Sequence, residues 1–197
     1  MGAMTAEIDP VQLAHARPFT VDDLEGMPDD GNRYELIDGT LIVSPAPGRR
    51  HQTVVGELFV ALRAACPHDM QALVAPFGVR PSLITELQPD VLVGRDEDFT
   101  EKILPAAPLL AVEVFSPSSR LNDLNTKKAA YQRFGVQSYW VIDPEEPKLI
   151  AWELDDMGVY CKVAEVEGND AFEVTLPFPV RIVPAELLGR LAAKDPE

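Results

Sequence analysis

The chain has 197 residues, enough for one domain with a full hydrophobic core. Its formal net charge is −15 at pH 7, which argues against a protein that coats nucleic acid, because such proteins are basic. That charge still permits a nuclease in which a bound divalent cation and a local basic patch supply a positive field. No apolar run approaches the roughly 20 residues of a transmembrane helix.

The cysteines and the first residues of the chain together indicate a cytoplasmic protein. Cys66 and Cys161 belong to no Cys-x-x-Cys pair, and two cysteines are too few for a disulfide framework, so reduced thiols are the simpler interpretation. The N-terminal residues lack both the basic region and the apolar region of a secretory signal peptide.

The N-terminal part predicts an arm that leads into the folded region. Residues 1–18 are expected to form a flexible arm, and residues 19–192 to form a single domain. Thr20, followed three residues later by Asp23, is typical of the start of a helix, in which the two residues exchange hydrogen bonds. A short helix is therefore expected directly after the arm.

A β-hairpin follows this short helix. The Asp38-Gly39 pair stands between two apolar runs at 34–37 and 41–43, and Asp-Gly in that setting is a strong signal for a two-residue turn. The sequence therefore predicts two antiparallel strands joined at this pair.

The spacing of apolar residues predicts the remaining elements. Recurrence at spacings of three and four indicates a helix, and an uninterrupted apolar run indicates a buried strand. In chain order we expect a helix at 51–65, a strand pair or one bent strand at 72–74 and 78–80, buried strands at 90–94 and 109–115, a helix at 122–134, a buried strand at 138–143, meander strands at 148–154 and 159–166, and a final helix at 182–188. The fold class is α+β: a mixed central sheet flanked by helices, with an added antiparallel meander.

Two acids belong to these buried strands. Glu113 lies inside the run 109–115, and Asp90 stands at the start of the run 90–94. Strands close in sequence are often neighbours in a sheet, so the two carboxylates are expected to converge. An ionised carboxylate is costly in such a place unless it is paired, protonated or bound to a metal. A hard cation such as Mg²⁺ takes one or two carboxylates together with water and phosphate oxygens.

Structural explanations of the same acids stay open at this point. Glu113 can be a buried acid paired with an arginine, and Asp90 can be a residue that caps the start of a strand after Pro89. A lysine beside the two acids would favour a catalytic role over a structural one, because two acids and a lysine are the minimal set of residues for metal-assisted phosphodiester cleavage. Asp123, Lys127 and Tyr131 follow at spacings of four and would share one helix face.

An ordered set of short motifs resembles the putative restriction-endonuclease family, formerly a domain of unknown function, which is similar to a branch of the PD-(D/E)xK nuclease superfamily. The resemblance covers roughly residues 20–185, and its specificity lies in the order of the motifs rather than in any one of them. The motifs are Tyr34-Glu35-Leu36-Ile37-Asp38-Gly39, His51, Pro89-Asp90-Val91, Val112-Glu113-Val114-Phe115-Ser116-Pro117-Ser118, the set Asp123, Lys127 and Tyr131, and Gly135-Val136 followed by Tyr139-Trp140-Val141-Ile142-Asp143-Pro144.

The resemblance implies a restriction-endonuclease-like fold and a set of site residues. Asp90 and Glu113 match the two acids of the superfamily and would be both catalytic residues and metal ligands. The lysine expected two residues after Glu113 is replaced by Phe115, so the resemblance implies a lysine from the following helix. Lys127 fits that role best, and Lys128 is the second choice.

Glu35 and His51 are further positions implied by the resemblance. Glu35 could reach the metal as an extra acid, and His51 could contact phosphate or carry a proton. The structural alternatives are an outward-facing strand residue for Glu35, a helix N-terminal residue without chemistry for His51, and a solvated lysine paired with Asp123 for Lys127.

The leading hypothesis is therefore an endonuclease that depends on Mg²⁺ (or Mn²⁺), hydrolyses DNA and acts as a homodimer. A second hypothesis is a catalytically inactive homodimer that keeps the nuclease fold and binds metal or nucleic acid. A third is a phosphodiesterase acting on a small nucleotide, which would suit the acidic surface better.

Overall fold

The computed structural model describes residues 17–116 and 119–194 of the chain. The expected arm at 1–18 therefore lies outside the described residues except for its last two positions. Within the described residues, no helix is long and apolar enough to cross a membrane.

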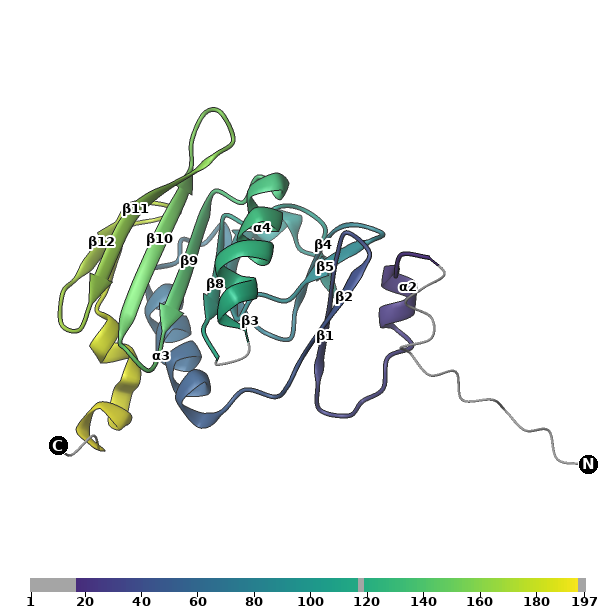
Figure 1. Cartoon of the computed structure of the whole chain (residues 1–197). Coiled ribbons are helices and arrows are strands. Elements are labelled where there is room, and N and C mark those ends of the chain that lie inside the picture. The colour runs from purple at the N-terminus through teal and green to yellow at the C-terminus, as the bar shows by residue number, and fades with distance from the viewer. Residues whose placement is uncertain (1–16, 117–118, 195–197) are drawn as a thin grey trace, which may run out of the picture.

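The described residues form six helical segments and thirteen strands. Figure 1 shows how they are arranged. The helices are α2 (Val21–Leu24), α3 (Arg49–Ala65), α4 (Lys128–Phe134), the 3-10 helices η1 (Asp96–Asp98) and η3 (Pro184–Lys194), and the π-helix η2 (Asn122–Lys127). The strands are β1 (Arg33–Ile37), β2 (Thr40–Ser44), β3 (Met70–Val74), β4 (Gly78–Ser82), β5 (Thr85–Leu87), β6 (Val91–Arg95), β7 (Ile103–Leu104), β8 (Leu110–Val114), β9 (Ser138–Asp143), β10 (Lys148–Leu154), β11 (Tyr160–Glu167), β12 (Phe172–Val174) and β13 (Val180–Ile182).

The central sheet has six strands in the order β11-β10-β9-β8-β6-β3. Its neighbours are antiparallel except for β8 and β9, which run parallel and are joined by the helical segment η2–α4. The expected meander strands are β10 and β11, which pair antiparallel with each other, and the sheet is mixed as the sequence predicts. This α+β architecture confirms the fold class.

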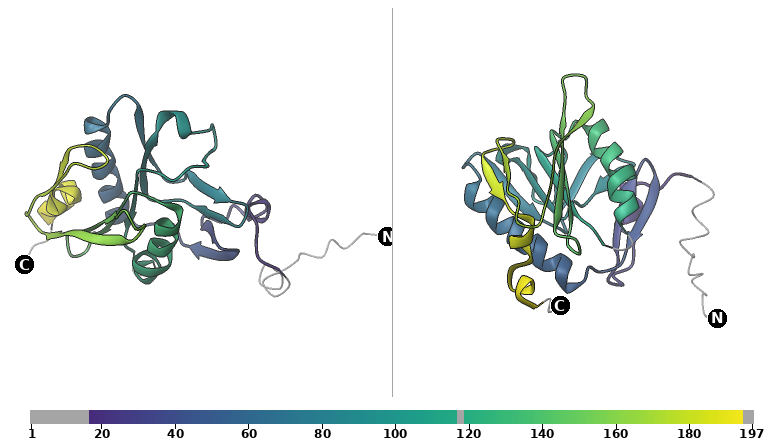
Figure 2. Two further views of the ribbon diagram at one scale, coloured as in Figure 1. Left: turned by 90° about the horizontal axis from the view of Figure 1, so that it is seen from above. Right: turned by 60° about the vertical axis from the view of Figure 1, so that its left-hand side comes forward.

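Two layers of side chains cover the two faces of this sheet. On one face the inward side of α3 and the segment η3 pack on alternate residues of β6, β8 and β9, including Val91, Val112 and Trp140. On the other face α4 packs on the intervening residues, including Ala111 and Tyr139. The second view of Figure 2 shows α3 and α4 on opposite sides of the sheet. The alternation follows from the two-residue period of a strand.

A second sheet, in the order β2-β1-β5-β4-β7, stands beside the central one. Its hairpin β1–β2 turns at Asp38 and Gly39, whose φ angles of 50° and 77° are those of the two-residue turn that Asp-Gly favours. The predicted hairpin is confirmed. The partner of β1 on its other side is β5, which leads directly to Gln88 and Asp90.

Two expected elements differ from the observed ones. The strands expected at 72–74 and 78–80 do not pair with each other, because β3 joins the central sheet while β4 joins the second one. The helix expected at 122–134 is not α-helical throughout, since its first part is the π-helix η2, with hydrogen bonds from i to i+5. Apolar spacing reveals neither the partner of a strand nor an extra residue in a helical turn.

Candidate active site

Asp90 and Glu113 lie on neighbouring strands. In the antiparallel pairing of β6 and β8, Val91 is opposite Val112, and the same register continued by one residue sets Asp90 opposite Glu113. Opposed residues point to the same face of a sheet, here the face that carries α4. The Asp90 carboxylate also accepts a hydrogen bond of 2.8 Å from the Val114 backbone N–H, which ties it to β8. The expected convergence of the two acids is observed.

Glu113 is held by two side chains from the helical segment that follows its strand. The Lys127 Nζ atom lies 3.2 Å from each carboxylate oxygen, and the Tyr131 hydroxyl donates a 2.9 Å hydrogen bond to Oε1. Burial raises the pKa of Glu113 well above its usual value; Lys127 opposes this rise, and the nearby carboxylates of Asp123, Asp90 and Glu35 add to it. Burial therefore favours the protonated form of Glu113, and the charge of Lys127 is the main influence that opposes it.

Lys127 is itself almost fully enclosed, with 4% of its surface exposed. Besides Glu113, its Nζ atom lies 2.8 Å from Glu35 Oε2 and 3.8 Å from Asp123 Oδ1. Burial lowers the pKa of Lys127, but the charges of Glu113, Glu35 and Asp123 outweigh burial and raise it above the ordinary value. The ammonium is therefore a permanent cation, which excludes the solvated lysine considered above.

Glu35 reaches the same place from the second sheet. Its Oε1 accepts a 2.8 Å hydrogen bond from the backbone N–H of Gln88, and its other oxygen pairs with Lys127. Glu35 is buried, with 1% exposure, so the outward-facing alternative does not hold. The segment between β5 and Asp90 is thereby fastened to β1.

Asp123 is the least supported acid of the group. It is buried, and neither carboxylate oxygen has a hydrogen-bond partner within the part of the chain that the structure describes. Burial raises its pKa to about 6, against the opposing charge of Lys127 and the Ser119 side chain. The π-helical turn of η2 sets both Asp123 and Lys127 toward the interior, where both are buried.

Asp90 has a different environment from Glu113. Its Oδ1 accepts a 2.9 Å hydrogen bond from Arg33, and its Oδ2 lies 3.1 Å from Nε2 of His51. Burial would raise the pKa of Asp90, but the hydrogen bond and charge of His51, the charge of Arg33 and the Val114 N–H outweigh burial and lower it to about 2. Asp90 is therefore a stable carboxylate.

A pocket of about 300 Å³ brings these groups together. Its wall includes the expected site residues Glu35, His51, Asp90, Glu113 and Lys127.

Lys128 and Phe115 lie elsewhere. The Lys128 Nζ atom lies 4.3 Å from the centroid of the Trp152 ring, on the side of β10, and is not part of the pocket wall. Phe115, which occupies the position of the superfamily lysine, is buried in the core beneath α4. Of the two candidate lysines, Lys127 is the one that lines the pocket.

Arg33 is the site residue that the sequence reasoning missed. It lines the pocket, and its NH1 atom donates to both Asp90 and the Gln88 carbonyl, the latter at 3.1 Å. The available signal was its position two residues before Glu35, because alternate residues of a strand share a face.

The residues present fit a hard divalent cation in their chemistry and charge. Asp90 and Glu113 offer carboxylate oxygens to one pocket, and four buried carboxylates (these two, Glu35 and Asp123) face the permanent cations Lys127 and Arg33. Such an excess of buried negative charge is what a divalent ion offsets. Among the described residues no three His, Cys, Asp or Glu side chains are arranged as a ligand set, because Lys127 lies between Glu35 and Glu113.

Comparison with known proteins agrees with the family resemblance found in the sequence. The chain is similar to a solved structure described as a putative nuclease belonging to DUF820 from Anabaena variabilis, with 18% sequence identity and a TM-score of 0.72. The match covers 88% of this chain and 99% of that one, and shows a shared fold. No curated protein matches the chain. The family model Uma2, described as "Putative restriction endonuclease", matches residues 21–186, and the chain therefore belongs to that family.

Proposed function

We propose that this protein is a metal-dependent endonuclease that hydrolyses phosphodiester bonds in DNA. One observation carries the proposal: the Lys127 ammonium lies between Glu113 and Glu35 in a pocket that Asp90 also lines. Two acids and a lysine within one pocket can hold a cation beside a phosphate and balance the charge that develops during its hydrolysis.

Asp90 and Glu113 are the residues that would hold the ion. Mg²⁺ or Mn²⁺ suits them, because hard cations prefer carboxylate oxygens and the pocket offers no cluster of Cys or His ligands. When bound, such an ion supplies polarisation of the phosphate and a lowered pKa of a coordinated water.

The chain's own residues would position and neutralise the reacting groups. Lys127 keeps its proton and would stabilise negative charge on the phosphate oxygens. Glu35 and Tyr131 fix the two ends of the Lys127–Glu113 pair. His51 and Arg33 would keep the Asp90 carboxylate oriented toward the pocket.

The expected partners follow from this activity. Cleavage of both strands of a duplex requires two centres, so we propose a homodimer with two-fold symmetry. Cys66 and Cys161 are free thiols, which supports the proposal of a reducing compartment such as the cytoplasm. Light scattering at micromolar concentration tests the dimer, and a monomer alone would contradict it.

Cleavage assays with varied DNA and RNA, in Mg²⁺ or Mn²⁺, test the activity. Native protein should cut DNA, and Asp90→Ala should not. Lys127→Met should lower cleavage by about two orders of magnitude or more, the scale seen when an electrostatic stabiliser is removed. Lys128→Met is the matched control, since the adjacent lysine lies outside the pocket. Equal rates for the two lysine variants would refute the role of Lys127.

Calorimetry tests the metal separately from turnover. Native protein should bind Mg²⁺ or Mn²⁺, and Glu113→Gln should lose this binding. Equal binding by both proteins would exclude Glu113 as a ligand.

The inactive alternative has a specific observation in its favour. Asp90 already has His51, Arg33 and the Val114 N–H as partners. Lys127 contacts the Glu113 carboxylate, which a metal ion would also have to contact. If native protein binds the ion and nucleic acid but cleaves nothing in the assays above, a binding protein with a nuclease fold becomes the better description.

A further inference from the structure

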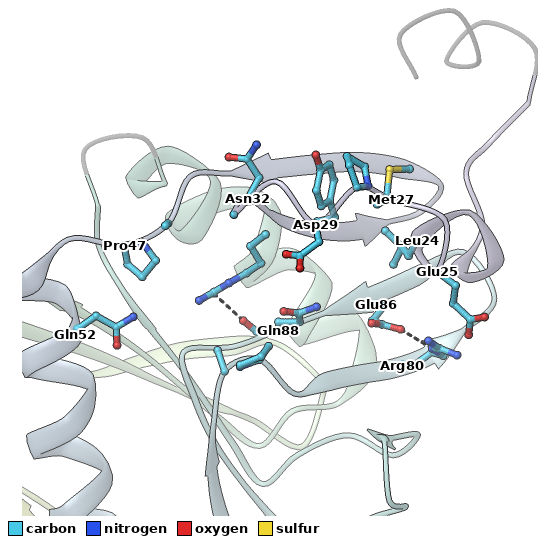
Figure 3. Close-up of a pocket in the computed structure, with 17 residues that line it drawn as sticks. Leu24, Glu25, Met27, Asp29, Asn32, Pro47, Gln52, Arg80, Glu86 and Gln88 are labelled. Atoms are coloured by element: carbon cyan, nitrogen blue, oxygen red, sulfur yellow. Dashed lines mark hydrogen bonds and ion pairs between the residues drawn. The ribbon is translucent and has the colours of Figure 1, made fainter. Parts of the chain in front are cut away.

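A second and larger pocket adjoins the candidate active site. It has a volume of about 540 Å³, and Figure 3 shows the residues that line it. It shares Arg33, Ala46 and Pro47 with the pocket of the candidate active site. Its wall extends from the start of α3 along β1 and β5 to α2. A molecule whose phosphate occupies the catalytic pocket would therefore place its neighbouring part here.

Two glutamine side chains in this pocket have no hydrogen-bond partner among the described residues. Gln52 comes from α3 and Gln88 from the segment that precedes Asp90 (Figure 3). Within the part of the chain that the structure describes, only the backbone of each makes hydrogen bonds. The Gln88 backbone binds both Glu35 and Arg33, so the side chain projects from the same support that orders the active site. A carboxamide presents a donor and an acceptor side by side, as the edge of a nucleobase does.

Apolar surfaces stand beside these amides. Pro47 and Pro76 line the pocket near the active site, and Leu24 and Met27 line it near α2. Flat or flexible apolar groups of this kind can cover the face of an unstacked base. The pocket therefore combines an apolar wall with hydrogen-bonding edges, as sites for small planar ligands do.

The charges around the pocket separate the place for a phosphate from the place for a base. Arg33 uses only its NH1 atom in the described interactions, which leaves the rest of its guanidinium for a phosphate at the junction of the two pockets. Farther away, Arg80 is paired with Glu86, and the exposed acids Glu25 and Asp29 would repel a second phosphate. The larger pocket thus suits one nucleotide rather than a run of backbone.

We infer that this pocket binds the nucleotide next to the scissile phosphate, with its base unstacked from the strand. Gln52 and Gln88 read the edge of the base, and Arg33 binds the phosphate. The inference rests on the proposed nuclease function, because it takes the scissile phosphate to lie in the smaller pocket. It adds to that function a site that discriminates between bases.

Binding without metal tests the pocket independently of cleavage. The probes are the four deoxynucleoside 5′-monophosphates, titrated into full-length ¹⁵N-labelled protein, with inorganic phosphate for comparison. The nucleotides should shift the side-chain amide signals of Gln52 and Gln88, whereas phosphate should shift the Arg33 guanidinium signal alone. The Gln52→Ala, Gln88→Ala double variant should weaken nucleotide binding about tenfold, as expected for loss of a bidentate base contact. Gln71→Ala, an exposed glutamine outside the pocket, is the matched control.

Absence of the amide shifts, or equal shifts from inorganic phosphate, would overturn the inference. Cleavage of an oligonucleotide randomised beside the cut then tests the reading of the base. Native protein and Gln71→Ala should prefer one base there, and the double variant should cleave all four with rate constants in a ratio near one. Cleavage by native protein without any preference also overturns it. If native protein cleaves nothing while the nucleotides still shift both amides, the proposed activity fails and the nucleotide site stands.

Discussion

Asp90 and Glu113 face one pocket from neighbouring strands, but their surroundings are opposite in character. Asp90 is held by His51, Arg33 and a backbone N–H, and its pKa falls to about 2. Glu113 depends on one cation, Lys127, which two further acids share, and its pKa is raised. Asp90 is therefore a carboxylate that stays charged, whereas the charge state of Glu113 depends on its neighbours, above all on Lys127.

The largest expected effect on stability comes from removing Lys127, the cation beside Glu113. Lys127→Met leaves three buried carboxylates without their shared partner, and breaking a buried ion pair costs about 3–5 kcal/mol. For a protein of this size we expect a fall in melting temperature of about 10 °C, measured by calorimetry.

Lys128→Met is the control for that measurement. Its ammonium is partly exposed and packs on Trp152, so we expect a change of about 1 kcal/mol or less. Similar losses in the two variants would show that Lys127 does not hold the acids together.

On the Glu113 side of the pocket, Asp123 should make the stability of the folded protein depend on pH. Its pKa is raised from 3.8 to about 6 in the folded protein, so the folded state binds this proton more tightly than the unfolded state. Tighter proton binding by Asp123 therefore stabilises the folded protein fully below about pH 4, and this stabilisation is lost as the pH rises through 6. The free energy of unfolding should fall by about 3 kcal/mol over this range on account of Asp123. Asp123→Asn, which stays neutral, should therefore lose less stability between pH 4 and pH 7 than native protein does.

Urea unfolding at a series of pH values in EDTA measures this difference. The exposed Asp96→Asn is the control and should follow the native curve. A curve for Asp123→Asn parallel to the native one would mean that Asp123 is charged in the folded protein without cost.

On the Asp90 side, removal of one partner should cost less because others remain. Arg33→Ala deletes a hydrogen bond to a charged group, worth about 2 kcal/mol. Arg33→Lys should recover part of this loss, since a single nitrogen donates to both Asp90 and the Gln88 carbonyl. Equal unfolding free energies for the two variants would contradict that arrangement.

The smallest effect on stability is expected from removing the Tyr131 hydroxyl, which donates a hydrogen bond to Glu113. Tyr131→Phe removes one 2.9 Å hydrogen bond from a side chain that otherwise packs in the core, for about 1 kcal/mol. Tyr34→Phe, whose hydroxyl binds the exposed Asp30, is the control and should change stability less. Urea midpoints distinguish them, and an unchanged midpoint for Tyr131→Phe would show that Lys127 alone supports Glu113.

The sequence was most informative where an ionisable side chain lies within a regular pattern of apolar residues or of helical spacing. Apolar runs around Asp90 and Glu113 predict buried strands, and the closeness of these runs in the sequence predicts that the strands are neighbours. The four-residue spacing correctly placed Lys127 and Tyr131 on the inner face of one helical segment. The resemblance to the family selected Lys127, because Phe115 removes the usual lysine.

Other features depend on long-range pairing, which local spacing does not encode. Arg33 meets Asp90 across 57 positions of the chain, and Glu35 meets Gln88 across 53. The separation of β3 from β4 into different sheets has the same cause. The contact of Lys128 with Trp152 on β10 likewise depends on how the helical segment lies on the sheet.

The π-helical turn of η2 makes the pocket depend on the number of residues in that turn as well as on their identity. An i to i+5 turn includes one residue more than an α-helical turn. Removing one residue such as the exposed Thr126 would restore α-helical geometry and rotate the preceding turn by about 100° relative to α4. Asp123 would then leave the interior while Tyr131 stayed. A deletion of one codon at this exposed position would therefore separate two buried residues of this site.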